Sequence, residues 1–384
     1  VRSSEITGQT RYGMLGTIRE FAVARLDATG QAPILRARHA RTYLSVAEEL
    51  AESLAAGGER ARAAMAGFAS ELDNLRAGME TAIEAGDDHS VVAYARSMFG
   101  FLRSRGLYDE CERRLGIAEA AARRMGDQRG LARLLNQQGL AAWDRFDLAR
   151  AQECFEASFA ISEELGDKER VLPTLINLGN VQWGGGDVRA ARATWERALG
   201  LADEQHHIGY RAVLSMCLGI AAMDVGEFDR SEALLAEALA VHRQRGNGVG
   251  EAMTLYNLSD LRSRQGREAE ALEAARRALQ LSEEGGEARN AALARVRVAR
   301  LSGERAEAER LAKEGLTIAR QLGDSACEIY AEDTLGLIAA SQGDHEEAVR
   351  RYAAALAVAA RTASELSAAD VLTNAATSLA RVDS

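Results

Sequence analysis

The strongest constraint on the fold is a dipeptide of glycine and an acidic or amide residue that returns about every forty residues. The dipeptide or a substitute occurs at Gly126-Asp127, Gly166-Asp167, His206-His207, Gly246-Asn247, Gly286-Glu287 and Gly323-Asp324. A second glycine lies about halfway between these marks, at Gly106, Gly186, Gly226, Gly266, Gly303 and Gly343. A fixed period of this length is typical of a solenoid, in which each unit packs only against its neighbours.

The composition indicates that the repeated unit is helical. Hydrophobic residues make up 47% of the chain but aromatic residues only 5%, so much of the apolar content is alanine and leucine. These residues favour helices, as do the abundant glutamate and arginine. The chain holds only two prolines, Pro33 and Pro173, and proline breaks helix interiors. We therefore expect an all-α protein.

Charge and cysteine usage exclude several classes of function. The net charge of −10 argues against a general nucleic-acid-binding surface, which needs a basic face. No apolar run is long enough to span a membrane, and no signal-peptide pattern opens the sequence. The four cysteines, Cys111, Cys154, Cys217 and Cys327, form no CxxC and no zinc-type cluster. We expect a cytoplasmic protein with buried thiols, without a cofactor and without direct contact to nucleic acid or a membrane.

One repeat, residues 166–205, shows how a unit is built. Two amphipathic helical patterns are separated by a turn at 184–187. Glycine suits the left-handed position after each helix, and the following aspartate can cap the next helix. Asp344 with Glu347 forms a capping box in the last full repeat. Each unit is therefore expected to be an antiparallel helix pair.

Alignment of the units shows columns of small and bulky residues. The middle of the first helix carries a small residue, at Gly139, Gly179, Gly219, Ser259 and Gly336. The start of the second helix carries another, at Cys111, Ala151, Ala191, Ser231, Ala271, Ala308 and Ala348. A bulky residue follows four positions later, at Leu115, Phe155, Trp195, Leu235 and Tyr352. A second small column lies at Ala118, Ser158, Ala198, Ala238, Ala278, Gly315 and Ala355.

These columns resemble the tetratricopeptide repeat (TPR), whose hallmarks match Leu178-Gly179, Gly186, Ala191, Trp195 and Ala198. The usual TPR unit is about 34 residues; this longer unit, with Gly-Asp in place of the terminal proline, resembles the MalT-like variety of bacterial regulators. The resemblance implies a right-handed α-solenoid of about seven helix pairs, starting near 86, 126, 166, 206, 246, 286 and 323. The sixth unit is three residues short in its first helix.

The first 85 residues do not follow the repeat. Thr17 and Glu20 form a capping box, so a helix is expected from Ile18 to Gly30, with a short strand over Arg11–Leu15 before it. The segment contains the block Arg11-Tyr12-Gly13-Met14-Leu15-Gly16-Thr17-Ile18-Arg19-Glu20-Phe21-Ala22 and, further on, Glu71-Leu72-Asp73-Asn74-Leu75-Arg76-Ala77.

Both blocks resemble bacterial signal-transduction ATPases of the STAND class, including LuxR- and AfsR-like transcriptional regulators. In that family the first block ends a winged-helix domain that follows the nucleotide-binding domain, and the second precedes the repeats. The match departs chiefly at Gly16, where the family usually has glutamate. The resemblance implies four regions: a winged-helix remnant at 1–30, a helical linker and N-terminal cap at 31–85, the repeats at 86–364, and a cap helix at 365–384.

A phosphate-binding loop of the form GxxxxGK[ST] does not occur in the sequence. The resemblance therefore implies the C-terminal sensor half of a larger protein, with an upstream nucleotide-binding module in cis, or a relative that lost its motor. Val1 is either a GTG-encoded start or the edge of a fragment.

Catalytic and metal sites are not predicted. Gly184-Gly185-Gly186 lies at a turn where glycine is structurally expected, and His206-His207 replaces a Gly-Asp pair with no third ligand nearby. No nucleophile with an identifiable base is present in the sequence pattern. We therefore do not expect an enzyme.

The candidate binding residues follow from the TPR resemblance, in which the first helix of each pair lines a concave groove. Carrying these positions onto the second to fifth units gives Arg133, Asn136, Leu140, Trp143, Asp144, Ile176, Asn180, Trp183, Met216, Ile220, Met223, Asp224, Met253, Tyr256 and Asp260. Aromatic residues and methionine are enriched where partners are held. The alternative is that some of these side chains pack against the neighbouring repeat.

Two functions remain open from the sequence. The first is the sensor region of a STAND-type transcriptional regulator, in which a protein, peptide or small-molecule effector in the groove relieves inhibition of an upstream ATPase. The second is a free-standing TPR adaptor that holds a peptide or helix of a partner protein. The two differ in whether residues 1–85 fold as a complete, protected cap.

Overall fold

The computed structural model describes residues 2–6, 9–13, 16–56, 58–145, 147–204, 206–362 and 365–382. Ahead of the repeats lie α1 (Gly16–Ala28), α2 (Ala32–Ala55) and α3 (Gly58–Glu84). The pairs that follow are α4 (Asp88–Ser104) with α5 (Tyr108–Met125), α6 (Gln128–Asp144) with α7 (Leu148–Glu164), α8 (Lys168–Gly184) with α9 (Val188–Glu204), and α10 (Ile208–Asp224) with α11 (Phe228–Gln244). The chain continues with α12 (Gly248–Arg264), α13 (Glu268–Gly285), α14 (Ala288–Leu301), α15 (Arg305–Leu322), α16 (Ser325–Ser341), α17 (His345–Thr362) and α18 (Glu365–Val382).

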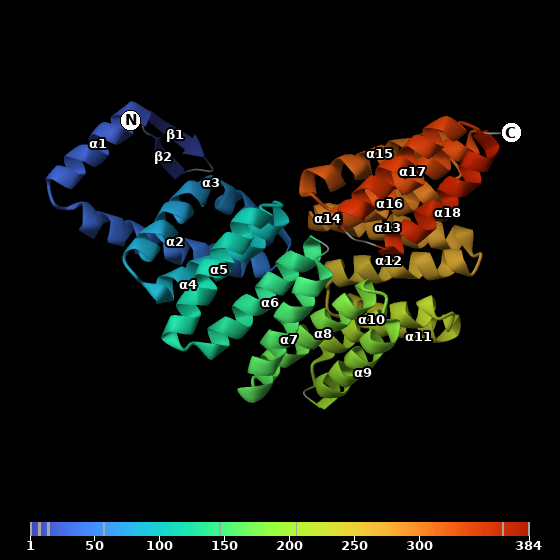
Figure 1. Ribbon diagram of the computed structural model, residues 1–384, viewed down its shortest axis with the longest axis horizontal. Helices are drawn as coiled ribbons and strands as arrows, with labels where there is room; N and C mark the ends of the chain where they lie inside the picture. Colours follow the sequence, from blue (N-terminus) through green and yellow to red (C-terminus); the bar gives the residue numbers. More distant parts are fainter. Residues whose placement is uncertain are drawn as a thin grey trace.

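The described helices from α4 to α17 form the seven predicted pairs, so the predicted α-solenoid is confirmed (Figure 1). The sixth pair has the shorter first helix that the sequence predicts, since α14 has 14 residues where α12 has 17. The helix α18 packs against α17 and α16 at the C-terminal end. The four-region division of the chain stays a prediction.

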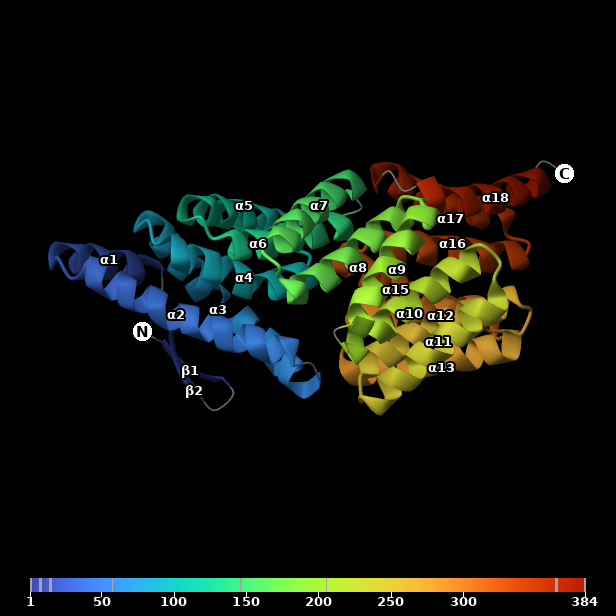
Figure 2. The same ribbon diagram turned by 90° about the horizontal axis from the view of Figure 1, so that it is seen from below.

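The N-terminal end adds a β-hairpin to the otherwise helical chain. Strands β1 (Arg2–Ile6) and β2 (Gln9–Gly13) pair antiparallel, with Arg2 opposite Gly13 (Figure 2). The strand expected over 11–15 thus begins earlier, and residues 14–15 lie outside the described part. Helix α1 begins at Gly16, two residues before the predicted start. The capping-box side chains of Thr17 and Glu20 also lie outside the described residues.

The repeated glycines close the helices as predicted, with one exception. Eleven of the twelve repeat-turn marks that the structure describes with a left-handed backbone are glycines, and at the remaining one His206 itself adopts φ 56°. Gly303 is the exception, because the turn there follows an extended Ser302 with φ −73° and ψ 130° and does not need a left-handed residue. The shortened first helix of that unit changes how the chain enters α15.

Aspartate side chains cap five of the helices that follow these glycines, and Asn247 caps a sixth. The Asp127 carboxylate accepts from the Gly130 amide at 2.8 Å, and the Asp344 carboxylate accepts from the Glu347 amide at 3.0 Å. Asp167 departs from the pattern: it occupies the N-cap of α8, but its side chain accepts no capping hydrogen bond. The capping rule therefore holds in only part of the array, since Leu107, Glu227 and Arg267 also occupy N-caps without a side-chain capping hydrogen bond.

The first helices of the pairs form the inner layer of the solenoid. Each first helix contacts the first helix of the next pair, in the series α4, α6, α8, α10, α12, α14 and α16, and α16 contacts α18. Among the described residues, consecutive second helices show no comparable contact with one another. When two layers of helices curve together, the layer whose members approach one another is the concave one. The first helices therefore line the inside of the curve.

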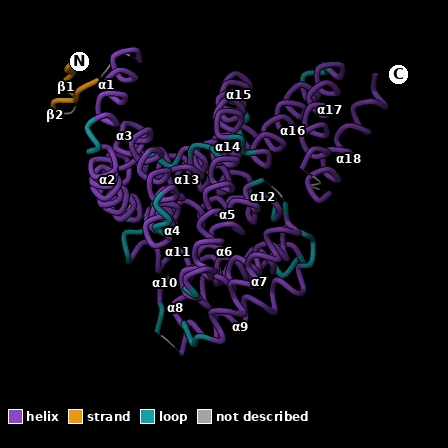
Figure 3. The backbone as a smooth tube through the Cα atoms, turned by 60° about the vertical axis from the view of Figure 1, so that its left-hand side comes forward, coloured by secondary structure: helices purple, strands orange, loops and turns teal. Residues whose placement is uncertain are grey.

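The curvature brings distant units into contact. The Arg62 guanidinium on α3 donates to the Glu284 carbonyl on α13 at 3.2 Å, and Figure 3 shows α13 and α14 beside α3. The α4–α5 turn meets the α15–α16 turn so closely that a Cβ added at Gly106 would lie 2.9 Å from the Leu322 carbonyl oxygen. A cavity of about 320 Å³ at this contact is lined by Gly106, Tyr108, Asp109, Arg145, Gly323 and Ser325.

Tyr108 is the aromatic side chain of this closing contact. Burial, with the carboxylates of Asp144 and Asp324 nearby, raises the pKa of Tyr108 to about 12. Asp324 belongs to the turn before α16, so the tyrosine is enclosed by units that are far apart in the sequence. The contact therefore joins the first unit directly to the turn between the sixth and seventh units.

Removing this ring should loosen the closed form. Tyr108 is half-buried, so Tyr108→Ala loses roughly 0.7–1.5 kcal/mol of apolar burial, which shifts the equilibrium toward open forms by about three- to tenfold. Small-angle X-ray scattering checks this as an increase in the radius of gyration. Phe228→Ala is the matched control, because Phe228 opens α11 as Tyr108 opens α5 but lies in a core cluster with residues of the adjacent helices α10 and α12. Equal scattering profiles for Tyr108→Ala and the wild-type protein would show that the contact does not hold the array closed.

Candidate binding surface on the first helices

The candidate residues lie on α6, α8, α10 and α12, within the inner layer. Four of them are buried, with exposed fractions of 8% or less: Asn136, Ile176, Met216 and Met223. Most of the others are half-buried: Arg133, Leu140, Trp143, Asp144, Asn180, Trp183, Ile220, Tyr256 and Asp260. Asp224 is exposed, and Met253 is 39% exposed. The inner layer therefore offers eleven of these side chains at least partly to solvent.

The buried candidates pack between neighbouring units. Met216 and Met223 belong to a hydrophobic cluster with Leu235 and Leu258. The Asn136 amide oxygen accepts from the Asn177 amide nitrogen at 3.1 Å, which joins α6 to α8. Interiors pack at crystal-like density, so these side chains are needed to hold the inner helices together. Their part in binding stays a prediction.

The accessible candidates from α8 to α12 are joined by a ladder of polar contacts. The Trp183 indole nitrogen on α8 donates to the Asp224 carboxylate on α10 at 2.7 Å. Arg264 on α12 lies 3.5 Å from that carboxylate and 3.2 Å from the carboxylate of Asp260. The Arg297 guanidinium on α14 donates to Asp260 at 2.8 Å. Four successive inner helices are therefore linked through one line of side chains.

The ladder continues to the C-terminal end with aromatic rings beside it. Arg297 lies over the rings of Tyr256 and Tyr330, at 5.0 Å and 5.4 Å from the two centroids. Arg300 donates to Asp333 on α16 at 2.7 Å, and Asn374 on α18 donates to the same carboxylate at 2.8 Å. Burial raises the pKa of the Tyr330 phenol, so this group stays protonated near neutral pH.

The N-terminal candidates are arranged differently. The Arg103 guanidinium on α4 donates to Asp144 at the end of α6 in a two-pronged ion pair, with distances of 2.5 Å and 2.9 Å. Trp143 packs over the next unit so closely that a Cβ added at Gly184 would lie 2.7 Å from the indole. The Asn180 amide oxygen accepts from the buried Cys217 thiol at 3.8 Å. The structure thus brings Trp183, Asp224, Tyr256 and Asp260 into one network and leaves Asp144 in a separate pair.

The C-terminal half of the ladder lies outside the residues predicted from the sequence. Arg297, Arg300, Tyr330 and Asp333 lie on α14 and α16, beyond the four units onto which the groove positions were carried. The same column positions in the sixth and seventh units point to them once the three-residue shortening of α14 is allowed for. The repeat pattern of the sixth and seventh units therefore contained the information needed to predict these residues.

Metal and thiol chemistry find no support in the described residues. This part of the chain holds no group of three or more His, Cys, Asp or Glu side chains placed to bind a metal ion. All four cysteines are buried and free, and burial raises the pKa of Cys111, Cys217 and Cys327 to about 12. None of the helices that the structure describes is long and apolar enough to cross a bilayer.

A curved double layer of forty-residue helix pairs, with glycine at the turns and small residues facing bulky ones, defines a tetratricopeptide-repeat solenoid. The sequence model of the tetratricopeptide repeat matches residues 130–204. The model of the MalT-like TPR region matches residues 207–382. These two stretches therefore consist of tetratricopeptide repeats, of the MalT-like kind from residue 207 onward.

Curated relatives and solved structures agree with this assignment. Proteins of Mycobacterium tuberculosis and Mycobacterium bovis that carry the name HTH-type transcriptional regulator are 29% identical over 192 residues, which is 47% of this chain and 21% of theirs. The chain thus spans about a fifth of the length of these relatives. A Rap protein crystallised with Competence and Sporulation Factor has a TM-score of 0.56 at 13% identity, covering 90% of this chain and 99% of that one. The quorum sensor NprR from B. thuringiensis has a TM-score of 0.54 at 12% identity, covering 76% and 83%. These likenesses show the fold.

Proposed function

We propose that this chain is the ligand-sensing TPR region of a STAND-type transcriptional regulator, and that it binds a peptide or protein segment on its inner face. The observation that carries the binding role is the continuous ladder from Trp183 to Asn374, which presents aromatic and polar groups along one side of the array. The role proposed is recognition and not catalysis. Its setting is proposed to be the bacterial cytoplasm, where the four free thiols would stay reduced.

The link to a regulator rests on the N-terminal blocks and on the relatives. The motifs at 11–22 and 71–77 resemble the segment that joins a winged helix to the repeats in STAND proteins. The mycobacterial relatives are named as transcriptional regulators and are much longer than the part they share with this chain. In the proposed mechanism a bound ligand shifts the array, and the hairpin with α1 transmits the shift to a nucleotide-binding module in cis.

The ladder also indicates how binding would change the array. All of its contacts except the Arg264–Asp260 pair within α12 join two neighbouring inner helices, so a ligand that exchanges one of these hydrogen bonds alters the angle between two units. Elements with two packing arrangements amplify such shifts, because packed interfaces do not deform continuously. Small rotations at each unit add along the solenoid. A change of angle at the ladder would therefore also change the closing contact at Tyr108.

The alternative function is a free-standing adaptor that holds a partner's peptide or helix without a switch. The observation that favours it is that α2 and α3 pack closely on each other and on α4, which forms a covered N-terminal end for the repeats. A stop codon just upstream of Val1 in the gene would support this alternative. A phosphate loop and winged helix in frame, followed by ligand-dependent nucleotide turnover in the full protein, would support the regulator.

The binding role is tested with the two tryptophans of the inner face. Peptides are selected for binding to the wild-type chain by display, and the affinity of the best one is measured by calorimetry. Trp143→Ala combined with Trp183→Ala should weaken that affinity tenfold or more, because buried aromatic anchors commonly account for ~2 kcal/mol or more each. Circular dichroism should show a helical content close to that of the wild-type protein.

A control separates loss of a contact from loss of packing. Phe159 is a half-buried aromatic residue on the second helix α7, beside Arg197, and belongs to the outer layer. Phe159→Ala removes a comparable ring and should leave the affinity unchanged. Equal affinities of the double tryptophan variant and the wild-type chain would contradict binding at this face.

A further inference from the structure

The inner face carries three arginines that the ladder does not use. Arg96 on α4, Arg133 on α6 and Arg170 on α8 follow one another at intervals of 37 residues. In a repeat of about 40 residues, each interval moves the position back by about one helical turn. The three residues therefore lie on a diagonal line across three adjacent inner helices.

These arginines have no ionic partner among the described residues. None of the three guanidinium groups makes an ion pair or a hydrogen bond with any residue that the structure describes. Moreover, the Nε atoms of Arg133 and Arg170 are buried without a hydrogen-bond partner. Buried polar groups are satisfied in the great majority of cases, so two orphaned guanidinium nitrogens on one face need an explanation.

Other arginines of the inner face differ in having carboxylate partners, although the Nε atom of Arg297 is also buried without a hydrogen-bond partner. Arg103, Arg264, Arg297 and Arg300 each lie within 2.5–3.5 Å of a carboxylate. The chain has 57 acidic and 47 basic residues, so carboxylates are available in excess. Leaving three arginines unpaired at adjacent inner helices is therefore a local property of the first three units and not a consequence of composition.

The electrostatic environment agrees with the geometry. Burial lowers the pKa of Arg96, and the charges of Arg133 and Arg170 lower it further, while Asp127 and Glu48 offset part of this effect. Burial and the charge of Arg133 also lower the pKa of Arg170, against the opposing influence of Asp167, Tyr210 and Glu169. The guanidinium groups stay protonated at neutral pH in any case. The three charges therefore repel one another in the unliganded chain.

We propose that Arg96, Arg133 and Arg170 form an anion-binding site that receives a carboxylate or phosphate group of the ligand. Guanidinium groups present a planar fork of donors that matches both anions. An anion placed among the three would satisfy the orphaned Nε atoms and remove the repulsion among them. This inference rests on the proposed function, and it adds the ligand's chemistry and its direction along the array.

The direction in which the ligand would lie along the array follows from the difference in charge between the two parts of the inner face. The inner-face arginines Arg264, Arg297 and Arg300 are neutralised by carboxylates, whereas Arg96, Arg133 and Arg170 on α4, α6 and α8 form no ion pair with a described residue. A ligand with one anionic end would therefore place that end on the first three units. Its less charged part would extend along the aromatic and polar ladder toward Tyr256 and Tyr330.

The test compares three probes on the full chain by calorimetry and thermal unfolding. The probes are inorganic phosphate, citrate, and a blocked pentapeptide with three consecutive glutamates, with the glutamine version of that peptide as the uncharged control. The variant is Arg96→Gln with Arg133→Gln and Arg170→Gln. Its matched control is Arg38→Gln with Arg113→Gln and Arg189→Gln, three exposed arginines that form no ion pair with any described residue and give the same change in net charge.

At least one anionic probe should bind the wild-type chain and the control with similar Kd, and the site variant should bind it at least tenfold more weakly. Binding of phosphate and citrate identifies a free small anion as the source, and binding of the glutamate peptide alone identifies an acidic peptide. Without a probe, the melting temperature of the site variant should equal or exceed that of the control, because like charges have been removed. A clearly lower value would indicate that the arginines are structural.

The proposal is overturned if no anionic probe binds the wild-type chain, or if the site variant and the control bind equally well. Its failure is distinguishable from failure of the proposed function. In one outcome, the display-selected peptide loses affinity for the double tryptophan variant but keeps its affinity for the arginine variant. That result would support the binding face and contradict the anion site. If neither variant affects that peptide, the binding face itself is wrong.

Discussion

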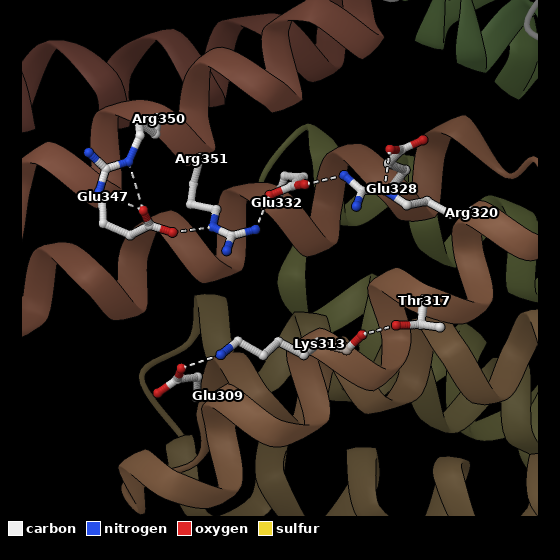
Figure 4. A network of polar contacts seen from close by, with 9 residues as sticks. All are labelled: Glu309, Lys313, Thr317, Arg320, Glu328, Glu332, Glu347, Arg350 and Arg351. Carbon is white, nitrogen blue, oxygen red and sulfur yellow. Dashed lines mark hydrogen bonds and ion pairs between the residues drawn. The ribbon is translucent and has the colours of Figure 1, made fainter.

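Removing both basic partners of Glu332 should destabilise the C-terminal units by about 3–5 kcal/mol, as expected when a buried charge is left without compensation. The Glu332 side chain on α16 is only 2% exposed. One carboxylate oxygen accepts from Arg320 on α15 at 2.6 Å, and the other accepts from Arg351 on α17 at 3.1 Å (Figure 4). Arg320→Gln combined with Arg351→Gln leaves this carboxylate buried and alone.

A third substitution should restore the stability of the double arginine variant. Adding Glu332→Gln to the two arginine changes removes the stranded charge, so most of the lost stability should return. Thermal unfolding gives the size of the effect, and amide hydrogen exchange locates it in α15, α16 and α17. These local readouts are needed because a repeat array does not unfold as a single two-state unit.

A surface pair on the same helices provides the control. Lys313 on α15 donates to Glu309 at 2.6 Å, but both side chains are more than two-fifths exposed (Figure 4). Lys313→Gln should therefore cost no more than ~0.5 kcal/mol. A triple variant that stays as unstable as the double would mean that the arginines contribute by packing and not by compensating Glu332.

Gly179→Ala should destabilise the third unit by about 1–3 kcal/mol, the usual cost of overfilling a core. A Cβ at this position would lie 2.6 Å from Cδ1 of the Trp195 indole. The indole is 1% exposed and its nitrogen donates to the Ile176 carbonyl at 3.2 Å, so the ring has no room to move away. The steric cost therefore exceeds the roughly 1 kcal/mol by which alanine favours a helix over glycine.

The companion variant is Gly200→Ala, on the exposed side of α9, where an added Cβ meets no atom within 4 Å. Helix propensity alone acts there, so Gly200→Ala should be neutral or stabilising by ~0.5–1 kcal/mol. A double-mutant cycle with Trp195→Leu measures the coupling between the two columns, and the cost of Gly179→Ala should shrink in that background. Equal changes in stability for Gly179→Ala and Gly200→Ala would show that the fit between position 179 and Trp195 is not steric.

The repeat itself could be predicted from the sequence because its signals are local. A left-handed glycine after a helix and an aspartate that caps the next helix act within a few residues, so the pair boundaries follow directly from them. The match between small residues of the first helix and bulky residues of the second helix is also local, because it lies within one unit. Glycine faces the rings of Phe155, Trp195 and Tyr352, and where the second helix has Ala275 the first helix has Ser259.

The candidate site was predictable only in part. Trp183, Asp224, Tyr256 and Asp260 were identified from their columns and do lie in one network. The same columns also supplied Met216 and Met223, which are buried, because a repeat position does not reveal how far a neighbouring unit covers it. The sequence also could not show that Arg96, Arg133 and Arg170 lack partners within the described part of the chain, since pairing depends on distances between units.

The amino-acid sequence by itself determined the helix pairs, their number in the described array and the tetratricopeptide class, because each unit repeats the same short-range turn, capping and packing rules. Only the tertiary structure decided the curvature, which places Gly106 against Leu322 and Arg62 against Glu284. The small rotation at each interface is set by side-chain shape and accumulates over the units. Contacts between residues more than two hundred positions apart therefore depend on the sum of all interfaces, which no single repeat encodes.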